Sequence, residues 1–239
     1  MKLHTIESTN DYLKLMSLNK SVEDFTVIVA NRQTKGRGQL GSKWKTEDGK
    51  NLTYSVFIDT SFISLDKQFY LNCAVSVSLF NVLKKLMLPN LKIKWPNDIL
   101  SDNYKICGIL IENIVKNVNT TQSIIGVGLN VNQLQFEYKK ASSLKKLTGI
   151  HYSLDEILIL LITELKSQVD RLRTYDFKLI ESDFKNELFR LNKPSTFQTP
   201  NKEVFIGIIK DVTDTGKLQV LLEDEEVKEF GLKEVKLLY

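Results

Sequence analysis

The sequence predicts an α+β protein in which a sheet packed on helices is followed by a small β-barrel. About five β-branched or alternating apolar runs occur before residue 135, which is the pattern of one sheet. Two helical patterns follow between residues 153 and 189, and only short strand-like runs separated by turn residues remain after residue 193. We therefore expect a main domain over residues 1–191 and a second, barrel-like domain over residues 192–239.

The composition is that of a globular protein with a sizeable core, since 42% of the 239 residues are hydrophobic and 26% are charged. The net charge of +4 comes from basic and acidic residues that are interspersed, so it does not indicate generic nucleic-acid binding. No stretch resembles a signal peptide or a membrane span. Cys73 and Cys107 lie in apolar surroundings without C-x-x-C spacing, which predicts reduced, buried thiols. These features predict a cytoplasmic protein.

The elements of the main domain follow from their periodicity. A strand over residues 2–6 precedes a helix that begins near Ser8, where Ser8 and Asp11 have capping-box-like spacing. We expect further strands over residues 27–29, 52–58, 91–95, 105–114 and 123–130, and a core helix over residues 69–87. The last two strands would be joined by a polar turn over residues 117–120. These strands should form one sheet.

The second half begins with helices. A short helix is expected over residues 142–148, and Ser153 with Glu156 opens an amphipathic helix that ends near residue 174. A further helix is expected over residues 177–189. Short strands over residues 204–211, 218–222, 226–230 and 235–238 would then build the barrel.

Residues 33–44, the glycine-rich loop, carry three glycines interleaved with basic residues after a buried strand. Glycine lets the backbone approach a ligand closely, and arginine grips anions in a bidentate fork. Trp44 would offer an aromatic face for a base. The loop therefore predicts an anion site, although a solvated turn with a core tryptophan fits the pattern equally well. Neither the dinucleotide-binding nor the Walker glycine spacing is present.

Three further stretches and the polar start of the first helix help to decide between an anion site and a solvated turn. Lys94 and Asp98 flank Trp95 and Pro96, and burying such charges is costly unless they are paired or bind a ligand, here a phosphate and Mg²⁺. Asn-Asp is also simply a good turn former. Two apolar strands contain glycines that weaken them, which suggests that something needs the space; these are Gly108, Gly126 and Gly128. Residues 8–10 are either a helix cap or a polar pocket for a small heterocycle.

Together, in order and spacing, these segments resemble biotin–protein ligases. The resemblance rests on Ser8-Thr9-Asn10, Gln33-x-x-Gly36-Arg37-Gly38, Trp44, Lys94-Trp95-Pro96-Asn97-Asp98, Lys105-x-x-Gly108-Ile109-Leu110-Ile111-Glu112 and Gly126-x-Gly128-x-Asn130. It covers essentially the whole chain. It implies a central mixed sheet packed on helices, of the class II synthetase-like type, followed by an SH3-like barrel. It also implies an ATP-dependent enzyme that forms biotinyl-5′-AMP and pyrophosphate and then transfers biotin to a lysine of a biotin carboxyl carrier protein domain.

The resemblance also implies roles for individual residues. Contacts to biotin would come from Ser8, Thr9, Asn10, Gln33, Gly36, Arg37, Gly38, Gln39, Lys105 and Gly108. Contacts to ATP would come from Arg37, Trp44, Asn51, Lys94, Asn97, Lys105 and Asn130. Lys105, Arg37 and Asp98 would be the catalytic residues, and Asp98 would also be the ligand of Mg²⁺. Cations that gain strength as charge develops are the device such a reaction needs.

One departure and two alternatives remain. Many relatives carry a second arginine where this chain has Gln39, so retention of the adenylate would depend more on Arg37 and Lys105. A lipoate- or octanoate-protein ligase shares the fold, and a non-catalytic nucleic-acid-binding module is the alternative from another class. No helix-turn-helix pattern precedes Ser8, so we expect no DNA binding. No stretch is long and apolar enough for a membrane span, so we also expect no membrane binding. In this family the sheet can pair across a dimer, which leaves a homodimer open.

Overall fold

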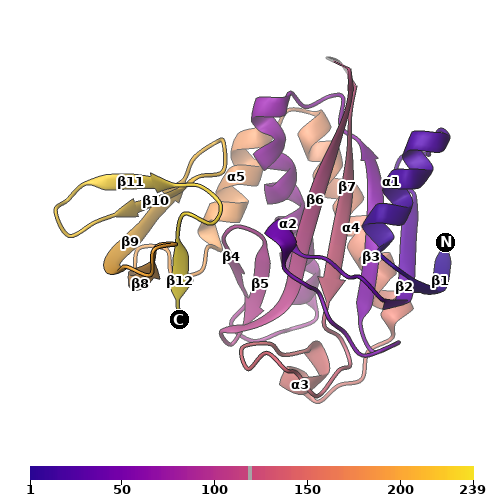
Figure 1. The fold of residues 1–239 in the computed structure, drawn as a ribbon, viewed down its shortest axis with the longest axis horizontal. Helices are drawn as coiled ribbons and strands as arrows, with labels where there is room; N and C mark the ends of the chain where they lie inside the picture. Colours follow the sequence, from indigo (N-terminus) through magenta and orange to yellow (C-terminus); the bar gives the residue numbers. More distant parts are fainter. Residues whose placement is uncertain (118–119) are drawn as a thin grey trace.

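The computed structural model describes residues 1–117 and 120–239, and its larger sheet has seven strands (Figure 1). In chain order these are β1 (Lys2–Ile6), β2 (Val27–Gln33), β3 (Leu52–Asp59), β4 (Lys92–Lys94), β5 (Asp98–Ser101), β6 (Tyr104–Asn117) and β7 (Thr120–Leu129). Their spatial order is β1-β2-β3-β7-β6-β5-β4. β1 is parallel to β2, and every other neighbouring pair is antiparallel. The predicted α+β class with a mixed central sheet is therefore confirmed.

Helices cover both faces of this sheet. α2 (Gln68–Lys85), α4 (Leu154–Arg173) and α5 (Phe177–Asn186) bury their apolar side chains in the main core, whereas α1 (Thr9–Asn19) lies on the opposite face (Figure 1). There Leu13 packs with Ile28 and Phe57. The short elements are η1 (Gln39–Gly41), η2 (Leu65–Lys67) and α3 (Leu144–Thr148). No helix in the described part of the chain is long and apolar enough to cross a membrane.

The predicted helix starts are confirmed by their caps. Ser8 Oγ accepts a hydrogen bond from the Asp11 amide at 3.2 Å, and Ser153 Oγ accepts one from the Glu156 amide at 3.4 Å. α4 buries residues at spacings of three and four along one stripe, which is why the helix is amphipathic. That stripe is Ile157, Leu161, Leu165, Val169 and Leu172.

The C-terminal segment forms a separate antiparallel sheet of five strands. They are β8 (Pro194–Gln198), β9 (Val204–Val212), β10 (Leu218–Leu221), β11 (Val227–Phe230) and β12 (Lys236–Leu238), in the spatial order β11-β10-β9-β8-β12. Trp95 Nε1 donates to the Gly216 carbonyl at 2.9 Å, so this sheet is tied to the segment between β4 and β5. We propose that residues 192–239 are the second domain that the sequence predicts.

Several boundaries differ from the predictions, and tertiary contacts explain them. β5 was not predicted; the sequence suggested only a break after residue 95, yet Asp98 pairs with both Lys94 and Gly108 in the sheet register. β8 begins at Pro194 and was not predicted. α5 ends at Asn186 and not near residue 189, because the Phe189 amide donates to the Ile93 carbonyl at 2.8 Å. The predicted turn over residues 117–120 falls on residues 118–119, which lie outside the described residues.

Candidate active site

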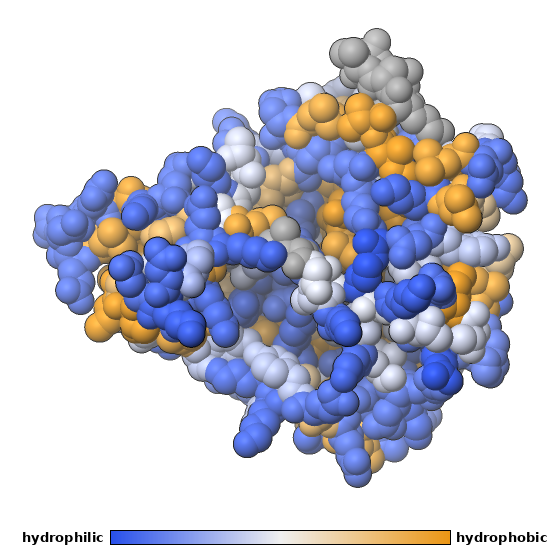
Figure 2. Space-filling model, in the orientation of Figure 1, coloured by the Kyte–Doolittle hydropathy of each residue, from blue (hydrophilic) through white to orange (hydrophobic). Residues whose placement is uncertain are grey.

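A cavity of about 840 Å³ opens between the seven-stranded sheet, the glycine-rich loop and the C-terminal sheet. Figure 2 shows this face of the molecule hollowed, with hydrophilic residues around the rim. Thirteen of the predicted site residues line the cavity: Ser8, Thr9, Asn10, Gln33, Arg37, Gly38, Gln39, Trp44, Lys94, Asn97, Asp98, Lys105 and Gly108. The fold thus gathers segments that are far apart in the sequence.

Strand register places the functional residues of the cavity floor in one row. Across β3, β7, β6, β5 and β4, the successive partners are Thr53, Gly128, Gly108, Asp98 and Lys94. Directly opposed residues in antiparallel strands point to the same face of a sheet. This row therefore presents a flat gap at the two glycines, followed by a carboxylate and a cation.

The indole of Trp44 occupies that gap. A Cβ atom built on Gly128 would come 2.5 Å from Trp44 Nε1, and one built on Gly108 would come 3.1 Å from Cζ3. Trp44 Nε1 is buried and has no hydrogen-bond partner. The space that the strand glycines leave is thus filled by an aromatic ring, and its N–H group faces the sheet without a hydrogen-bond partner. The loop is closed behind it by a 3.0 Å hydrogen bond from the Trp44 amide to the Gly36 carbonyl, although Gly36 itself does not line the cavity.

Polar side chains at the start of α1 form a second compartment, which we call the α1 pocket and define by Ser8, Thr9, Asn10, Gln33 and Ser55. Gln33 Oε1 accepts hydrogen bonds from the Thr9 amide at 2.7 Å and from Thr9 Oγ1 at 2.9 Å. The Gln33 amide oxygen is therefore occupied, and its NH₂ group is the part that can donate to a ligand. Ser55 Oγ lies 2.7 Å from Thr9 Oγ1 and 2.5 Å from Asn10 Oδ1. A pocket with donors and acceptors held in this way suits a small polar heterocycle.

Ser55 is a site residue that the sequence analysis missed. It lies fully buried in the middle of β3, opposite Gly126 on β7. In the sequence it is one of several residues of β3 with a hydroxyl group, beside Thr53 and Tyr54, and no signal sets it apart. A Cβ atom on Gly126 would come 2.9 Å from Asn10 Cγ, so this glycine lets the Asn10 side chain lie against the sheet.

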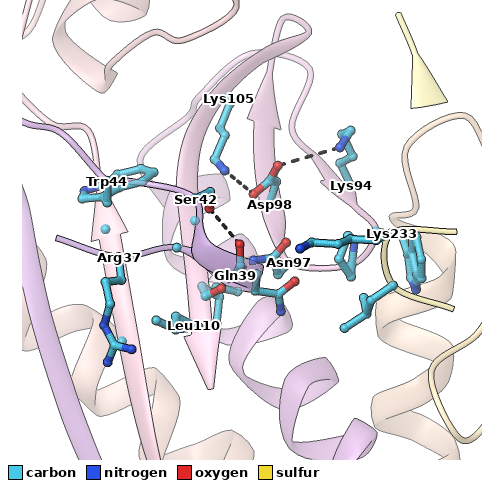
Figure 3. Close-up of a pocket in the computed structure, with 18 of the residues that line it drawn as sticks. Arg37, Gln39, Ser42, Trp44, Lys94, Asn97, Asp98, Lys105, Leu110 and Lys233 are labelled. Atoms are coloured by element: carbon cyan, nitrogen blue, oxygen red, sulfur yellow. Dashed lines mark hydrogen bonds and ion pairs between the residues drawn. The ribbon is translucent and has the colours of Figure 1, made fainter. Parts of the chain in front are cut away.

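Lys105, Asp98 and Lys94 form a charged cluster on the other side of the cavity (Figure 3). Lys105 Nζ lies 2.5 Å from Asp98 Oδ1, and Lys94 Nζ lies 3.8 Å from Asp98 Oδ2. Burial lowers the pKa of Lys94, an effect that the carboxylate of Asp98 opposes. Lys94 and Asp98 are thus paired with each other, while their predicted contacts to a phosphate and to Mg²⁺ stay predictions. Two ammonium groups against one carboxylate leave an excess positive charge for an anion.

The Arg37 side chain points away from this cluster in Figure 3. Its guanidinium forms an ion pair with Asp11 and lies 3.2 Å from Glu112 Oε2. The contact to a phosphate that the sequence suggests for Arg37 stays a prediction, because two carboxylates on α1 and β6 hold the side chain here.

Asn51 and Asn130 do not line the cavity. Asn51 Oδ1 accepts a hydrogen bond from the Val131 amide at 2.9 Å, and Asn130 Nδ2 donates to the Ser142 carbonyl at 3.0 Å. Both side chains are buried and shape the segment that follows β7. Their predicted contacts to a nucleotide remain predictions.

The C-terminal sheet adds cations that no motif indicates. Lys202, Lys233 and Lys236 line the cavity, and Figure 3 shows the Lys233 side chain extending towards Asn97. Their placement depends on how the two sheets dock, which a sequence pattern does not reveal. Among residues 1–117 and 120–239, no group of three or more His, Cys, Asp or Glu side chains could hold a metal ion.

Residues 3–130 match the model of the biotin/lipoate A/B protein ligase family. The chain is 27% identical over 229 residues to the bifunctional ligase/repressor BirA of Escherichia coli, covering 94% of this chain and 69% of that protein. It is 27% identical over 215 residues to the biotin–[acetyl-CoA-carboxylase] ligase of Mycobacterium tuberculosis, covering 88% and 79%.

A solved structure has the same fold along the whole chain. The biotin protein ligase from Aquifex aeolicus in complex with biotin and ATP superimposes with a TM-score of 0.82 and 25% identity, covering 100% of this chain and 97% of that one. The family match spans more than half of the chain and includes the α1 pocket, the glycine-rich loop and the charged cluster. The chain therefore belongs to the biotin/lipoate A/B protein ligase family.

Proposed function

We propose that the protein is a biotin–protein ligase, which activates biotin with ATP and transfers it to a lysine of a biotin carboxyl carrier protein domain. Relatives that carry this name, and a similar structure bound to biotin and ATP, support the assignment. The observation that carries it is that the α1 pocket and the Lys105–Asp98 pair open into one cavity. A heterocycle and a phosphate can therefore be held side by side.

The first step joins two anions, so the site must lower their repulsion. A carboxylate oxygen of biotin attacks the α-phosphorus of ATP, the bond from that phosphorus to the bridging oxygen breaks, and pyrophosphate leaves. The α1 pocket would hold the ureido ring, and backbone amides of Arg37 and Gln39 would take the biotin carboxylate. Lys105 would lie between the carboxylate and the α-phosphate, where an ammonium gains strength as charge develops. Trp44 would stack on adenine.

The outer phosphates would lie towards the C-terminal sheet. Lys94 and Asn97 bound the cavity there, and Lys233 faces them. Mg²⁺ in such enzymes is usually held by one or two carboxylates together with the substrate's phosphates. Asp98 supplies one carboxylate in the cluster, which fits an ion that arrives with ATP.

The second step transfers the acyl group. The acceptor lysine amine attacks the carbonyl of biotinyl-5′-AMP, the bond to the phosphate oxygen breaks, and AMP leaves. The attacking amine must lose a proton, and we propose that Asp98 receives it. A homodimer stays a prediction, which light scattering would test.

The α1 pocket favours biotin over a lipoyl or octanoyl chain. Thr9 occupies the Gln33 amide oxygen, so the Gln33 NH₂ group can donate to a ureido oxygen, whereas an alkyl chain would offer it no acceptor. Unpaired buried polar groups are a strong basis for rejecting a substrate.

The test is transfer of biotin to a purified carrier domain with ATP and Mg²⁺. We expect incorporation by the wild type and a loss of at least about a hundredfold in Lys105→Ala and Arg37→Ala, with their folds retained. Lys35→Ala, which removes an exposed lysine of the same loop that pairs with Glu7, is the matched control. No biotin transfer by the wild type, with octanoate or lipoate accepted instead, would keep the fold and change the substrate.

A further inference from the structure

Glu112 lies where the α1 pocket meets the glycine-rich loop. Resting on the proposed function, we propose that Glu112 is a positioning residue that couples occupation of the α1 pocket to closure of the loop. No role follows for Glu112 from the reaction itself, because its carboxylate lies beside Asn10 and Arg37 and not in the Lys105–Asp98 cluster.

The first contact of Glu112 orients Asn10. Asn10 Nδ2 donates to Glu112 Oε2 at 2.8 Å, so the Asn10 amide oxygen faces Ser55, 2.5 Å from its Oγ. A carboxylate accepts hydrogen bonds only, and it therefore selects this orientation of the amide. Glu112 thus decides which polar atom of Asn10 the pocket presents.

The second contact holds the loop. Both carboxylate oxygens of Glu112 lie within hydrogen-bond distance of one Arg37 nitrogen, at 3.2 and 3.3 Å. Asp11 binds the same guanidinium from α1. The Arg37 side chain of the glycine-rich loop is thereby held by ion pairs to two elements of the main domain, α1 and β6.

The two carboxylates that hold Arg37 are not equivalent. The Glu112 side chain is 23% exposed, whereas that of Asp11 is 51% exposed. Charge interactions strengthen as water is excluded, so Glu112 should contribute more to holding Arg37. The loop has another ion pair, Lys35 with Glu7, whose side chains are 68% and 66% exposed and which touches neither Asn10 nor Arg37.

One carboxylate that serves both partners makes their positions interdependent. A ligand that fixes Asn10 also fixes Glu112, and an Arg37 already held by Glu112 loses less conformational freedom when the loop closes. The reciprocal effect is that a loosened loop weakens binding in the α1 pocket.

The test uses three variants of the whole protein. Glu112→Gln keeps an acceptor for Asn10 and removes the charge that holds Arg37, whereas Glu112→Ala removes both contacts. Glu7→Gln is the matched control, because it removes the carboxylate that pairs with Lys35 of the same loop, outside this network. Hydrogen exchange of the ligand-free protein reports the loop through the Gly38 and Trp44 amides, which bond to Ser42 and Gly36. Titration calorimetry reports the dissociation constant for biotin.

We expect roughly fivefold faster exchange of the loop amides in both Glu112 variants and wild-type rates in Glu7→Gln. We expect the biotin dissociation constant to rise about tenfold or more in Glu112→Ala and less in Glu112→Gln, with the KM for ATP changed by less than about twofold. Loop exchange and biotin affinity within twofold of wild type in the Glu112 variants would overturn the proposal. If Glu112→Ala does not fold, Glu112→Gln decides by the same exchange measurement. Absence of biotin binding by the wild type would instead refute the proposed function. The two failures can be told apart, because the exchange comparison between the variants is made without ligand.

Discussion

Trp44 lies flat against Gly128, so closely that a methyl group on the glycine would meet the indole nitrogen at 2.5 Å. This contact joins the glycine-rich loop to the floor of the cavity. It explains why a buried strand carries a residue that weakens it.

Replacing Gly128 by alanine should displace the indole. We expect the fluorescence emission of Trp44 to shift and the KM for ATP to rise about tenfold, because the ring that would stack on adenine is moved from its position against β7. The neighbouring residue Val127 points to the other face of the sheet. Val127→Ala is therefore the control for a general disturbance of β7. Trp44 and Trp95 are the two tryptophans of the chain. The emission spectrum of Trp44→Phe therefore shows which part of the emission comes from Trp44. An unchanged emission spectrum in Gly128→Ala would contradict the packing.

Gly126→Ala should affect biotin and not ATP. The added Cβ would lie 2.9 Å from Asn10 Cγ, which forces the Asn10 amide out of the α1 pocket. We expect the dissociation constant for biotin to rise at least about tenfold, while the KM for ATP stays within about twofold. Calorimetry and steady-state kinetics on the same preparation would separate the two. Equal losses for both substrates would show that the residue acts on the sheet as a whole.

Activity should fall at alkaline pH because Lys94 loses its proton there. Burial lowers its pKa, and the charges of Lys105 and Lys236 lower it further, while Asp98 raises it. The ammonium exists below the pKa, so the cation is lost at a lower pH than for an exposed lysine. We expect kcat/KM for ATP to decline through that range, and the decline to move to higher pH in Lys94→Arg. A pH profile that is identical in the variant would assign the decline to another group.

Gln39→Arg should slow the escape of the activated intermediate. Gln39 lines the cavity, and a guanidinium there would add charge opposite the phosphate of the adenylate. We expect less biotin on lysines of an added bystander protein, measured against biotin on the carrier domain. Gln39→Leu, which removes the hydrogen-bonding amide without adding charge, should give more bystander labelling. Equal ratios in the three proteins would show that retention does not depend on this position.

Trp95→Phe should destabilise the junction between the two sheets. Trp95 Nε1 donates to the Gly216 carbonyl at 2.9 Å, and loss of such a bond costs about 1–2 kcal/mol in the free energy of unfolding. Denaturant unfolding followed by circular dichroism would measure it. Trp44→Phe is the control, because Trp44 Nε1 has no partner to lose. An equally large loss of unfolding free energy in Trp44→Phe would show that the effect comes from the smaller ring and not from the hydrogen bond.

The sequence predicted those parts of the site whose chemistry is local. Ser8 caps α1 as its spacing indicates, and Lys94 pairs with Asp98 as the cost of burying either alone requires. Ser55 and Lys233 could not be found in this way. Ser55 meets the α1 pocket because β3 pairs with β7 beneath α1. Lys233 lies near Asn97, on the other side of the cavity, because the C-terminal sheet docks there.

By itself, the sequence determined the order of most elements, the glycines that leave room on the sheet, and the family to which the ordered motifs belong. Only the tertiary structure decided where the long side chains point. Arg37 suits a phosphate by its chemistry, yet it lies between carboxylates of α1 and β6 that are 26 and 75 residues away in the chain. The direction of a flexible charged side chain depends on the nearest opposite charges, and those are set by strand register and helix docking.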